Sequence, residues 1–271
     1  MLINLQPHAA YAYTGGKPFN AQLPTAVFIH GAQNDHSVWA LQTRYFAHHG
    51  FSVLAVDLPG HGRSKGQPLS TVEAMADWLS TLLVSAGVQR AVLIGHSMGS
   101  LIALETASRA KALVTGVALV GTAYPMKVSP LLLEASEHRE PSAIDMVNIW
   151  SHSSIAQKPS APGPGFYVPS GSRRLMQHVA KKNTAKVFFT DFSACNAYAN
   201  GEAAAKALDC PTLFLLGRND MMTPPKAVAS LIAALPQSQR VVVNGSGHAL
   251  MAEQPDQVLD ALFEFANGSL K

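Results

Sequence analysis

Apolar residues along this chain follow two alternating patterns. Short runs that are apolar almost throughout have the length of strands, and between them lie stretches whose apolar residues recur at helical spacing. Strands that are apolar on both faces are typical of a parallel sheet covered by helices on both sides. The pattern therefore predicts an α/β fold with a doubly wound, mostly parallel, twisted sheet. Its predicted strands are Thr25–His30, Phe51–Val56, the run that starts at Ala91, Ala112–Val120, Cys210–Gly217 and Arg240–Asn244.

The predicted helices fill the intervals between these strands. They cover Ser37–His49, Thr71–Ala86, the stretch from Ser97 to Ser108, Pro224–Leu235 and Pro255–Ala266. We expect the buried stripe of the first helix to consist of Val38, Leu41, Tyr45 and Phe46. Thr223 is expected to cap the helix that starts at Pro224, because threonine is a common N-cap and proline suits the first helical position. Ahead of the first long strand, Leu2–Leu5 and Ala9–Tyr13 predict an edge hairpin.

The strand pattern stops between Tyr124 and about Ala207. Helical pieces replace it, separated by Gln157–Pro169, which is rich in Pro, Gly and Ser. These pieces are Pro130–Glu140, Ile144–Ser151, Ser172–Lys182 and Phe188–Tyr198. The segment leaves and rejoins the sheet at strand ends, so we expect a helical cap over one sheet edge. The predicted division is a core of residues 1–124 and 208–271 and a cap of residues 125–207.

Composition narrows the class of protein. With 271 residues, 48% of them hydrophobic and 14% charged, the chain can bury a large core. The formal net charge is +3 and its basic residues are scattered, which argues against a nucleic-acid partner. The N-terminus lacks the pattern of a secretory signal, and no apolar stretch is long enough to span a membrane. We therefore expect a cytoplasmic protein without a membrane partner, either a monomer or a homodimer.

Cysteine and histidine placement gives no indication of a metal or redox site. The two cysteines, Cys195 and Cys210, stand in no C-x-x-C or metal-ligand spacing. No pair of histidines or carboxylates has ligand spacing with a third partner, so no metal is predicted. Among the histidines near the predicted sheet edge, His30 and His96 are expected to shape a site there.

The segment Gly95-His96-Ser97-Met98-Gly99 joins a predicted strand directly to a predicted helix. Such a junction forces the residue at its apex into a strained conformation, and glycines on either side avoid collisions between strand and helix. This is the G-x-S-x-G pattern of a nucleophile elbow. Ser97 is therefore the candidate nucleophile.

A serine nucleophile needs a general base and a group that orients that base. Asp220 and His248 each follow a predicted parallel strand, so their loops open at the same sheet edge as Ser97. Asp220 has an alternative role as a turn residue. Asp57 is the rival acid, and Asp191 and Asp209 lie in the cap or at its exit.

Five motifs resemble those of the α/β-hydrolase fold family, in the family's order. They are His30-Gly31-Ala32, the segment Asp57-Leu58-Pro59-Gly60-His61-Gly62-Arg63-Ser64, Gly95-His96-Ser97-Met98-Gly99, Gly217-Arg218-Asn219-Asp220 and Gly247-His248. The resemblance implies a Ser97-His248-Asp220 triad and an oxyanion hole made by the backbone N–H groups of Ala32 and Met98. It makes Asp57 a structural residue of its loop. It also implies that no cofactor is needed.

The combination of Gly-His-Ser-Met-Gly with His-Gly-Ala looks like carboxylesterases and monoacylglycerol lipases of that family. The resemblance implies a serine hydrolase that cleaves small-molecule carboxylic esters through an acyl-enzyme. A serine at the elbow argues against the haloalkane dehalogenase and epoxide hydrolase branches. Ring-cleavage C–C hydrolases, thioesterases, cofactor-free haloperoxidases and ligand receptors of the same fold remain alternatives, since fold does not choose among them.

Apolar residues of the cap are candidates for an acyl pocket of finite depth. Such a pocket predicts a preference for short to medium acyl chains. The expected substrate-binding residues are His30, Met126, Trp150, Phe166 and Tyr167, and Leu131, Leu132, Met146 and Ile149 are further candidates.

Overall fold

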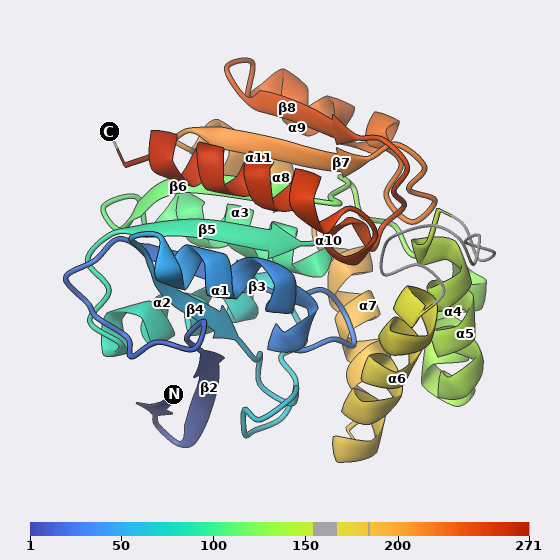
Figure 1. Cartoon of the computed structure of the whole chain (residues 1–271). Coiled ribbons are helices and arrows are strands. Elements are labelled where there is room, and N and C mark those ends of the chain that lie inside the picture. Colours follow the sequence, from blue (N-terminus) through green and yellow to red (C-terminus); the bar gives the residue numbers. More distant parts are fainter. Residues whose placement is uncertain (154–166, 184, 271) are drawn as a thin grey trace.

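The computed structural model describes residues 1–153, 167–183 and 185–270. Its centre is an eight-stranded sheet in the order β1-β2-β4-β3-β5-β6-β7-β8 (Figure 1). β1 and β2 form the predicted N-terminal hairpin, β2 pairs antiparallel with β4, and all other neighbours are parallel. The strands are β1 (Leu2–Leu5), β2 (His8–Tyr13), β3 (Thr25–Ile29), β4 (Ser52–Val56), β5 (Ala91–His96), β6 (Val114–Val120), β7 (Thr212–Gly217) and β8 (Gln239–Val243).

Burial along the central strands follows the apolar pattern, whereas the outer strands β1, β2 and β8 are partly exposed. Every residue of β3, β4, β5 and β7 is buried. In β8 only Val243 is buried, because this strand lies at the edge of the sheet. The prediction of a parallel sheet buried on both faces is confirmed for the central strands, and the exposed side of β8 is a property of its edge position.

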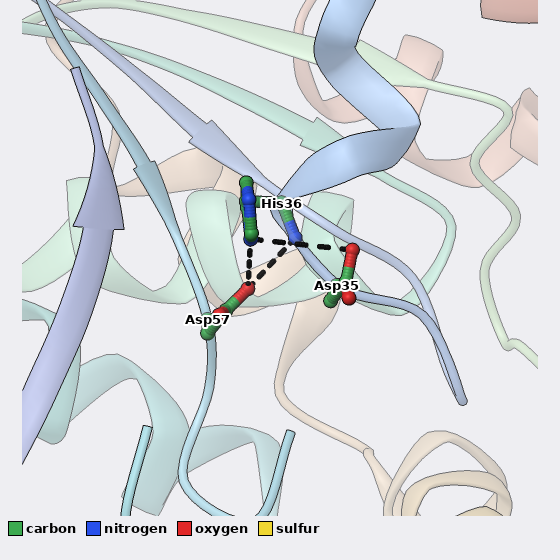
Figure 2. A group of neighbouring side chains, drawn as sticks. All are labelled: Asp35, His36 and Asp57. Carbon is green, nitrogen blue, oxygen red and sulfur yellow. Dashed lines mark hydrogen bonds and ion pairs between the residues drawn. The ribbon is translucent and has the colours of Figure 1, made fainter. Parts of the chain in front are cut away.

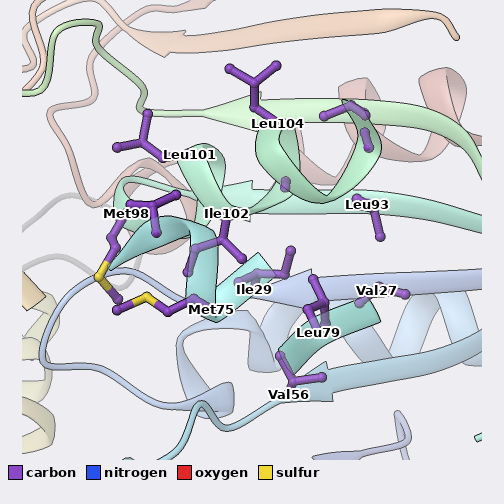
Figure 3. Close-up of a cluster of buried hydrophobic side chains, with 14 of the residues drawn as sticks. Val27, Ile29, Val56, Met75, Leu79, Leu93, Met98, Leu101, Ile102 and Leu104 are labelled. Atoms are coloured by element: carbon purple, nitrogen blue, oxygen red, sulfur yellow. The ribbon is translucent and has the colours of Figure 1, made fainter. Parts of the chain in front are cut away.

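Helices cover both faces of the sheet (Figure 1). On one face, α2 (Val72–Ser85) and α3 (Met98–Arg109) pack in a cluster that includes Val27 and Leu93 of the strands (Figure 3). On the other face, α1 (Ala40–His48) and α11 (Pro255–Gly268) bury Phe46 and Phe265 against the strands. Because helices cover the central strands on both faces, residues from neighbouring strands can meet at the strand ends to form a site.

The first predicted helix differs in phase from its prediction. The structure has a short 3-10 turn, η1 (His36–Trp39), capped by the Asp35 side chain, followed by α1. Leu41 and Tyr45 are 56% and 39% exposed, so they are not on the buried stripe. Gln42 is buried instead, because its side-chain amide donates to the carbonyl of Met251 at 3.1 Å. This hydrogen bond offsets only part of the cost of burying the amide, because Oε1 of Gln42 is buried without a hydrogen-bond partner in the described residues.

Beyond the carboxyl ends of the central strands lie α4 (Pro130–His138), α5 (Glu140–Ser151), α6 (Tyr167–Lys182) and α7 (Val187–Ala197), as Figure 1 shows. They share a buried cluster of their own that includes Leu132, Met176 and Phe192. α6 includes Pro169, which the sequence placed in a loop. Proline is tolerated there because the first turn of a helix needs no N–H donor at that position.

The remaining helices complete the core. α8 (Gly201–Lys206) packs against α3 and against α9 (Ala229–Ala234), although the sequence division placed residues 201–206 in the cap. A second 3-10 turn, η2 (Pro225–Val228), precedes α9, and α10 (Leu250–Glu253) precedes α11. Within the described ranges, every helix is too short or too polar to cross a lipid bilayer. The exact limits of core and cap stay a prediction.

Candidate active site

Ser97 lies at the junction of β5 and α3 in a strained conformation, with φ 54° and ψ −121°. A Cβ atom added to Gly95 would lie 2.0 Å from the carbonyl oxygen of Gly99. One added to Gly99 would lie 2.4 Å from the carbonyl oxygen of Ile29. Neither position tolerates a side chain, so the glycines allow β5, α3 and β3 to approach closely around Ser97. This is the strand-to-helix turn that the sequence predicts.

Asp220 and His248 meet at the end of the sheet. Nδ1 of His248 lies 2.8 Å from Oδ2 of Asp220, and both residues are buried. Burial raises the pKa of the Asp220 carboxyl, but the His248 ring and hydrogen bonds from Thr223 outweigh it, so this pKa lies below its ordinary value. A charged carboxylate requires Nδ1 of His248 to carry the hydrogen. Nε2 is then the nitrogen that can accept a proton.

Thr223 has a different role from the one predicted. Pro224 is the N-cap of η2 and makes no side-chain cap bond, so the expected Thr223 cap is wrong. The Thr223 hydroxyl instead donates to Oδ2 of Asp220 at 2.7 Å and lies 3.0 Å from Nδ1 of His248. The geometry of the loop after β7 turns this hydroxyl toward the carboxylate. Sequence reasoning missed this residue, and the Asp-x-x-Thr spacing was the available signal.

Asp220 is also a turn residue, as its alternative interpretation proposed. Its Oδ1 accepts the backbone N–H groups of Met222 and Thr223, each at 2.8 Å. The two interpretations are therefore compatible, since one carboxylate oxygen serves the turn and the other contacts His248. The turn bonds fix the direction in which Oδ2 points.

His96 contacts His248, the proposed general base, through a hydrogen bond and a close approach of the two rings. Its Nε2 lies 2.9 Å from the carbonyl oxygen of His248, and the two rings are 4.6 Å apart. Burial lowers the pKa of His96 to about 3, so its ring is neutral and Nε2 carries the hydrogen that this carbonyl accepts. His96 thus shapes the site, as expected from the sequence.

Met98 directly follows Ser97 in the chain, and Ala32 lines the same cavity as Ser97. Ala32 is in the loop after β3, where the N–H of Asn34 donates to the carbonyl of Gly31 at 3.3 Å. Met98 is the first residue of α3, with its side chain in the core cluster beside Met75 (Figure 3). The first N–H groups of a helix have no partner within the helix. Both backbone N–H groups stay predicted oxyanion donors.

The rival carboxylates are occupied elsewhere. Asp57 accepts from the His36 backbone at 2.8 Å and from the Arg63 backbone at 2.8 Å, which fits its expected structural role. Asp191 contacts His61 at 2.9 Å, and Asp209 contacts Lys111 at 2.8 Å. Asp220 is therefore the acid that the structure places against His248.

One group of side chains in the described residues has the spacing to hold a metal ion, namely Asp35, His36 and Asp57 (Figure 2). Its atoms already bind one another or the backbone. Oδ1 of Asp35 accepts from Ser37 at the start of η1, and Nδ1 of His36 lies 2.8 Å from Asp57. Spacing along the sequence did not indicate this group, because Asp57 lies 21 positions after His36. Its contacts stabilise the two loops, and the absence of a metal stays a prediction.

Two cavities adjoin the candidate triad, and Ser97 and His248 line both of them. The larger has a volume of about 370 Å³ and the smaller about 180 Å³. Phe192 and Met222 also line both, so they lie where the two cavities meet. Ala32 lines the larger one. The sheet edge thus offers space on two sides of one serine and histidine.

The predicted substrate-binding residues divide between these cavities. Met126 and Trp150 line the smaller one, and Tyr167 lines the larger. Phe166 lies outside the described residues. The structure brings His30 to neither cavity: it is fully buried, and its Nε2 accepts the N–H of Leu58 at 3.1 Å. His30 was expected to bind substrate, but its ring instead accepts a backbone hydrogen bond from the loop after β4.

The further candidates from the cap differ in burial, because they lie on different faces of their helices. Leu132 lines the smaller cavity, whereas Leu131 and Ile149 are 57% and 50% exposed. Cavity residues that the sequence did not indicate include Val147, Leu175 and Met251. They belong to three different helices, so only the packing of these helices brings them together.

Comparisons with known proteins agree with this architecture. The profile of the alpha/beta hydrolase family matches residues 26–261. A putative esterase/lipase of Haemophilus influenzae is 27% identical over 255 residues, which cover 90% of this chain and 83% of that protein. The sn-1-specific diacylglycerol lipase ABHD11 of Mus musculus is 27% identical over 267 residues, covering 91% and 82%.

A solved structure is similar over nearly the whole length. The malate-bound thermophilic esterase of Thermogutta terrifontis superposes with a TM-score of 0.80 at 25% identity, covering 99% of this chain and 98% of that one. These relatives are named as esterases or lipases, and their fold is the one described above. This chain therefore belongs to the alpha/beta hydrolase family, as a hydrolase of the esterase/lipase type that acts on ester bonds.

Proposed function

We propose that this protein cleaves carboxylic esters of small to medium apolar molecules with a Ser97-His248-Asp220 triad, through an acyl-enzyme. The observation that carries the proposal is the contact of 2.8 Å between His248 and the buried Asp220, beside cavities that Ser97 and His248 line together. An oriented histidine next to a strained serine is the arrangement that activates a hydroxyl nucleophile.

In the first half of the reaction, Oγ of Ser97 attacks the ester carbonyl and Nε2 of His248 takes the hydroxyl proton. Asp220 stabilises the imidazolium that forms and stays deprotonated throughout. The negative charge on the carbonyl oxygen is bound by the N–H groups of Ala32 and Met98. When the tetrahedral intermediate collapses, the bond to the alcohol oxygen breaks and His248 donates its proton to that oxygen.

In the second half, a water molecule attacks the acyl carbon while His248 takes one of its protons. The bond to Ser97 breaks, the proton returns to Oγ, and the carboxylic acid leaves. The larger cavity suits this substrate class because most of its lining residues are apolar. The smaller cavity combines apolar residues with Lys127, Ser129 and Thr223. The position of these cavities under the cap gives the pocket a finite depth.

The test combines covalent labelling with kinetics. A fluorophosphonate probe should label the wild-type chain once, and Ser97→Ala should abolish both labelling and turnover of p-nitrophenyl esters. Asp220→Asn should lower kcat by about a thousandfold or more with KM little changed, since the histidine loses its orientation and charge partner. Labelling that survives Ser97→Ala, or a fully active Asp220→Asn variant, contradicts the assignment.

A substrate panel separates the alternative chemistries. Multiple turnovers of simple esters support the esterase, whereas a few turnovers at most indicate a ligand receptor. Fast cleavage of a thioester or a vinylogous 1,5-diketone, with poor cleavage of every simple ester, reassigns the same three residues to thioesterase or C–C hydrolase chemistry.

A further inference from the structure

Helix α7 of the cap contacts two loops of the core through one buried carboxylate. Oδ2 of Asp191 accepts the backbone N–H of Gln33 at 2.8 Å and lies 2.9 Å from Nε2 of His61. Gln33 and Asp191 are completely buried and His61 is 2% exposed. Gln33 comes from the loop after β3 and His61 from the loop after β4. Asp191 therefore connects the cap to both loops at the catalytic edge.

Gln33 directly follows Ala32, one of the two proposed oxyanion donors. It has a φ of 57°, in the left-handed region that non-glycine residues adopt at a cost of about 1–2 kcal/mol. The N–H that Asp191 accepts belongs to the peptide unit that joins Ala32 to Gln33. Asp191 therefore holds the peptide that joins Ala32 to Gln33 in its orientation. The same hydrogen bond opposes relaxation of Gln33 to a conformation with negative φ.

The Gln33 side chain reaches two more cap helices. Its amide nitrogen lies 3.2 Å from Oε1 of Glu140 in α5 and 3.3 Å from the carbonyl oxygen of Met176 in α6. Three cap helices therefore contact the one residue that follows Ala32. The turn that carries the predicted oxyanion donor is therefore hydrogen-bonded to all three of these helices.

The pair of His61 and Asp191 is ionic. Nδ1 of His61 lies 3.0 Å from the carbonyl oxygen of Pro59, which can only accept, and Nε2 faces the carboxylate. Both ring nitrogens therefore donate, as only an imidazolium can. Burial lowers the pKa of His61, but Asp191 outweighs it and the net direction is upward.

Of the titratable groups beside this pair, His30 and Cys195 are uncharged and Asp57 is negatively charged. The His30 ring lies 4.9 Å from His61, and burial lowers the pKa of His30 to about 4, so this neighbour is neutral. Cys195 of α7 also stays uncharged, because burial raises the pKa of its thiol. Asp57, whose negative charge raises the pKa of His61 further, is itself bound by His36.

We propose that Asp191 is a positioning residue for ester hydrolysis: by accepting the Gln33 N–H, it fixes the turn that presents the Ala32 N–H to the oxyanion. The proposal rests on the proposed function. Donors held in place before the reaction stabilise the developing charge without reorganising, and losing one such donor costs roughly a hundred- to a thousandfold in rate. Misalignment of the Ala32 donor costs a part of this factor.

Two substitutions separate the hydrogen bond from the charge. Asp191→Ala removes the acceptor, and kcat for p-nitrophenyl butyrate should fall about 10- to 100-fold while KM stays within about threefold. The inhibition constant of an aryl trifluoromethyl ketone, whose hemiketal oxyanion occupies the same hole, should rise by the factor by which kcat/KM falls. Asp191→Asn keeps an oxygen for the Gln33 N–H, so kcat should stay within about fivefold.

Asp145→Ala is the matched control. Asp145 is also a cap carboxylate, and it contacts Arg173 at 2.6 Å on the exposed side of α5 and α6. Its loss should leave kcat and ketone inhibition within about twofold, because exposed ion pairs contribute little.

Removing one partner of a buried ion pair is strongly destabilising, so a second variant guards against unfolding. The double substitution His61→Phe with Asp191→Leu removes both charges together and also removes the acceptor. It should show the same loss of kcat and of ketone inhibition as Asp191→Ala.

A folded Asp191→Ala or double variant that keeps kcat and ketone inhibition within twofold overturns the proposal, as does equal loss in Asp191→Ala and Asp191→Asn. An effect confined to KM and thermal stability also overturns it, because a purely structural role predicts that result. Failure of the proposed function is a different outcome: the wild-type chain then lacks turnover that depends on Ser97.

Discussion

The Thr223 hydroxyl donates to Oδ2 of Asp220 at 2.7 Å, the same oxygen that Nδ1 of His248 contacts at 2.8 Å. Two donors therefore converge on one buried oxygen, while the other oxygen of the carboxylate is held by backbone N–H groups. Hydrogen bonds to the charged form lower the pKa of a carboxyl group. Thr223 thus helps to keep Asp220 charged and aimed at the histidine.

Thr223→Val should weaken both the fold and the proposed reaction. Valine has a similar shape but no donor, and a lost hydrogen bond to a charged group costs about 1.5–3 kcal/mol of unfolding free energy. We expect kcat to fall roughly three- to tenfold, since Asp220 keeps its other partners. Urea unfolding and steady-state kinetics measure the two effects. Thr223→Ser should retain both properties, and a valine variant equal to wild type would show that the hydroxyl has no role.

The strained backbone at Ser97 predicts that the nucleophile lowers the stability of the fold. Its φ of 54° is unfavourable for serine and easy for glycine. Ser97→Gly should relieve roughly 1–3 kcal/mol of strain. It should also cost about 0.4–1 kcal/mol through the freer unfolded chain.

We therefore expect the Ser97→Gly variant to be about 1 kcal/mol more stable than Ser97→Ala, with neither hydrolysing esters. Denaturant midpoints of the two inactive variants give the comparison directly. A glycine variant less stable than the alanine variant would mean that the junction stores no strain in the serine backbone.

The sheet and the elbow were predictable because each depends on local sequence. The apolar runs of β3, β4, β5 and β7 need only a buried environment, and Gly95 and Gly99 stand at fixed distances from Ser97 along the chain. The placement of Asp220 beside His248 followed from strand order, since parallel strands end at one edge.

Contacts between distant segments were not predictable in the same way. The bond between Gln33 and Asp191 joins residues that are 158 positions apart, and it depends on how α7 packs. Leu41 was expected to be buried because leucine is apolar, but α1 exposes Leu41 and buries Gln42, whose amide donates to the carbonyl of the distant Met251. His30 stands in a motif next to the site, yet its ring is used inside the loop. The spacing of apolar residues describes one helix or strand at a time, so it cannot show which distant residue a buried polar side chain will contact.

The ion pair of His61 and Asp191 predicts how stability depends on pH. The pKa of His61 is raised in the folded state, so the folded state binds its proton more tightly than the unfolded state. The stabilising contribution is fully present below the unfolded value of about 6.5 and is lost as pH rises through the folded pKa. The unfolding free energy of wild type should therefore fall toward alkaline pH.

His61→Gln should remove this part of the slope. The measurement is the unfolding free energy in urea between pH 6 and pH 10 for both chains, with the variant subtracted from wild type. His138→Gln serves as control, because this histidine is exposed on the cap. A difference between wild type and His61→Gln that stays constant with pH would contradict a charged His61.

Phe192 predicts the chain-length preference, because it lines both cavities beside Ser97. In wild type, kcat/KM along an acyl series from acetate to palmitate should peak at short to medium chains, without a jump in rate at the onset of emulsion. Phe192→Leu removes bulk where the cavities meet, so the peak should move to longer chains. The lost ring carbons should cost about 2 kcal/mol of stability.

Phe188→Leu is the matched control: Phe188 is fully buried, its ring lies 4.6 Å from that of Phe192, and it lines neither cavity. It should cost similar stability and leave the peak unmoved. An equal shift in both variants would mean that general loosening of the cap sets chain length, and a wild-type rate still rising at palmitate would indicate an open groove of the lipase type.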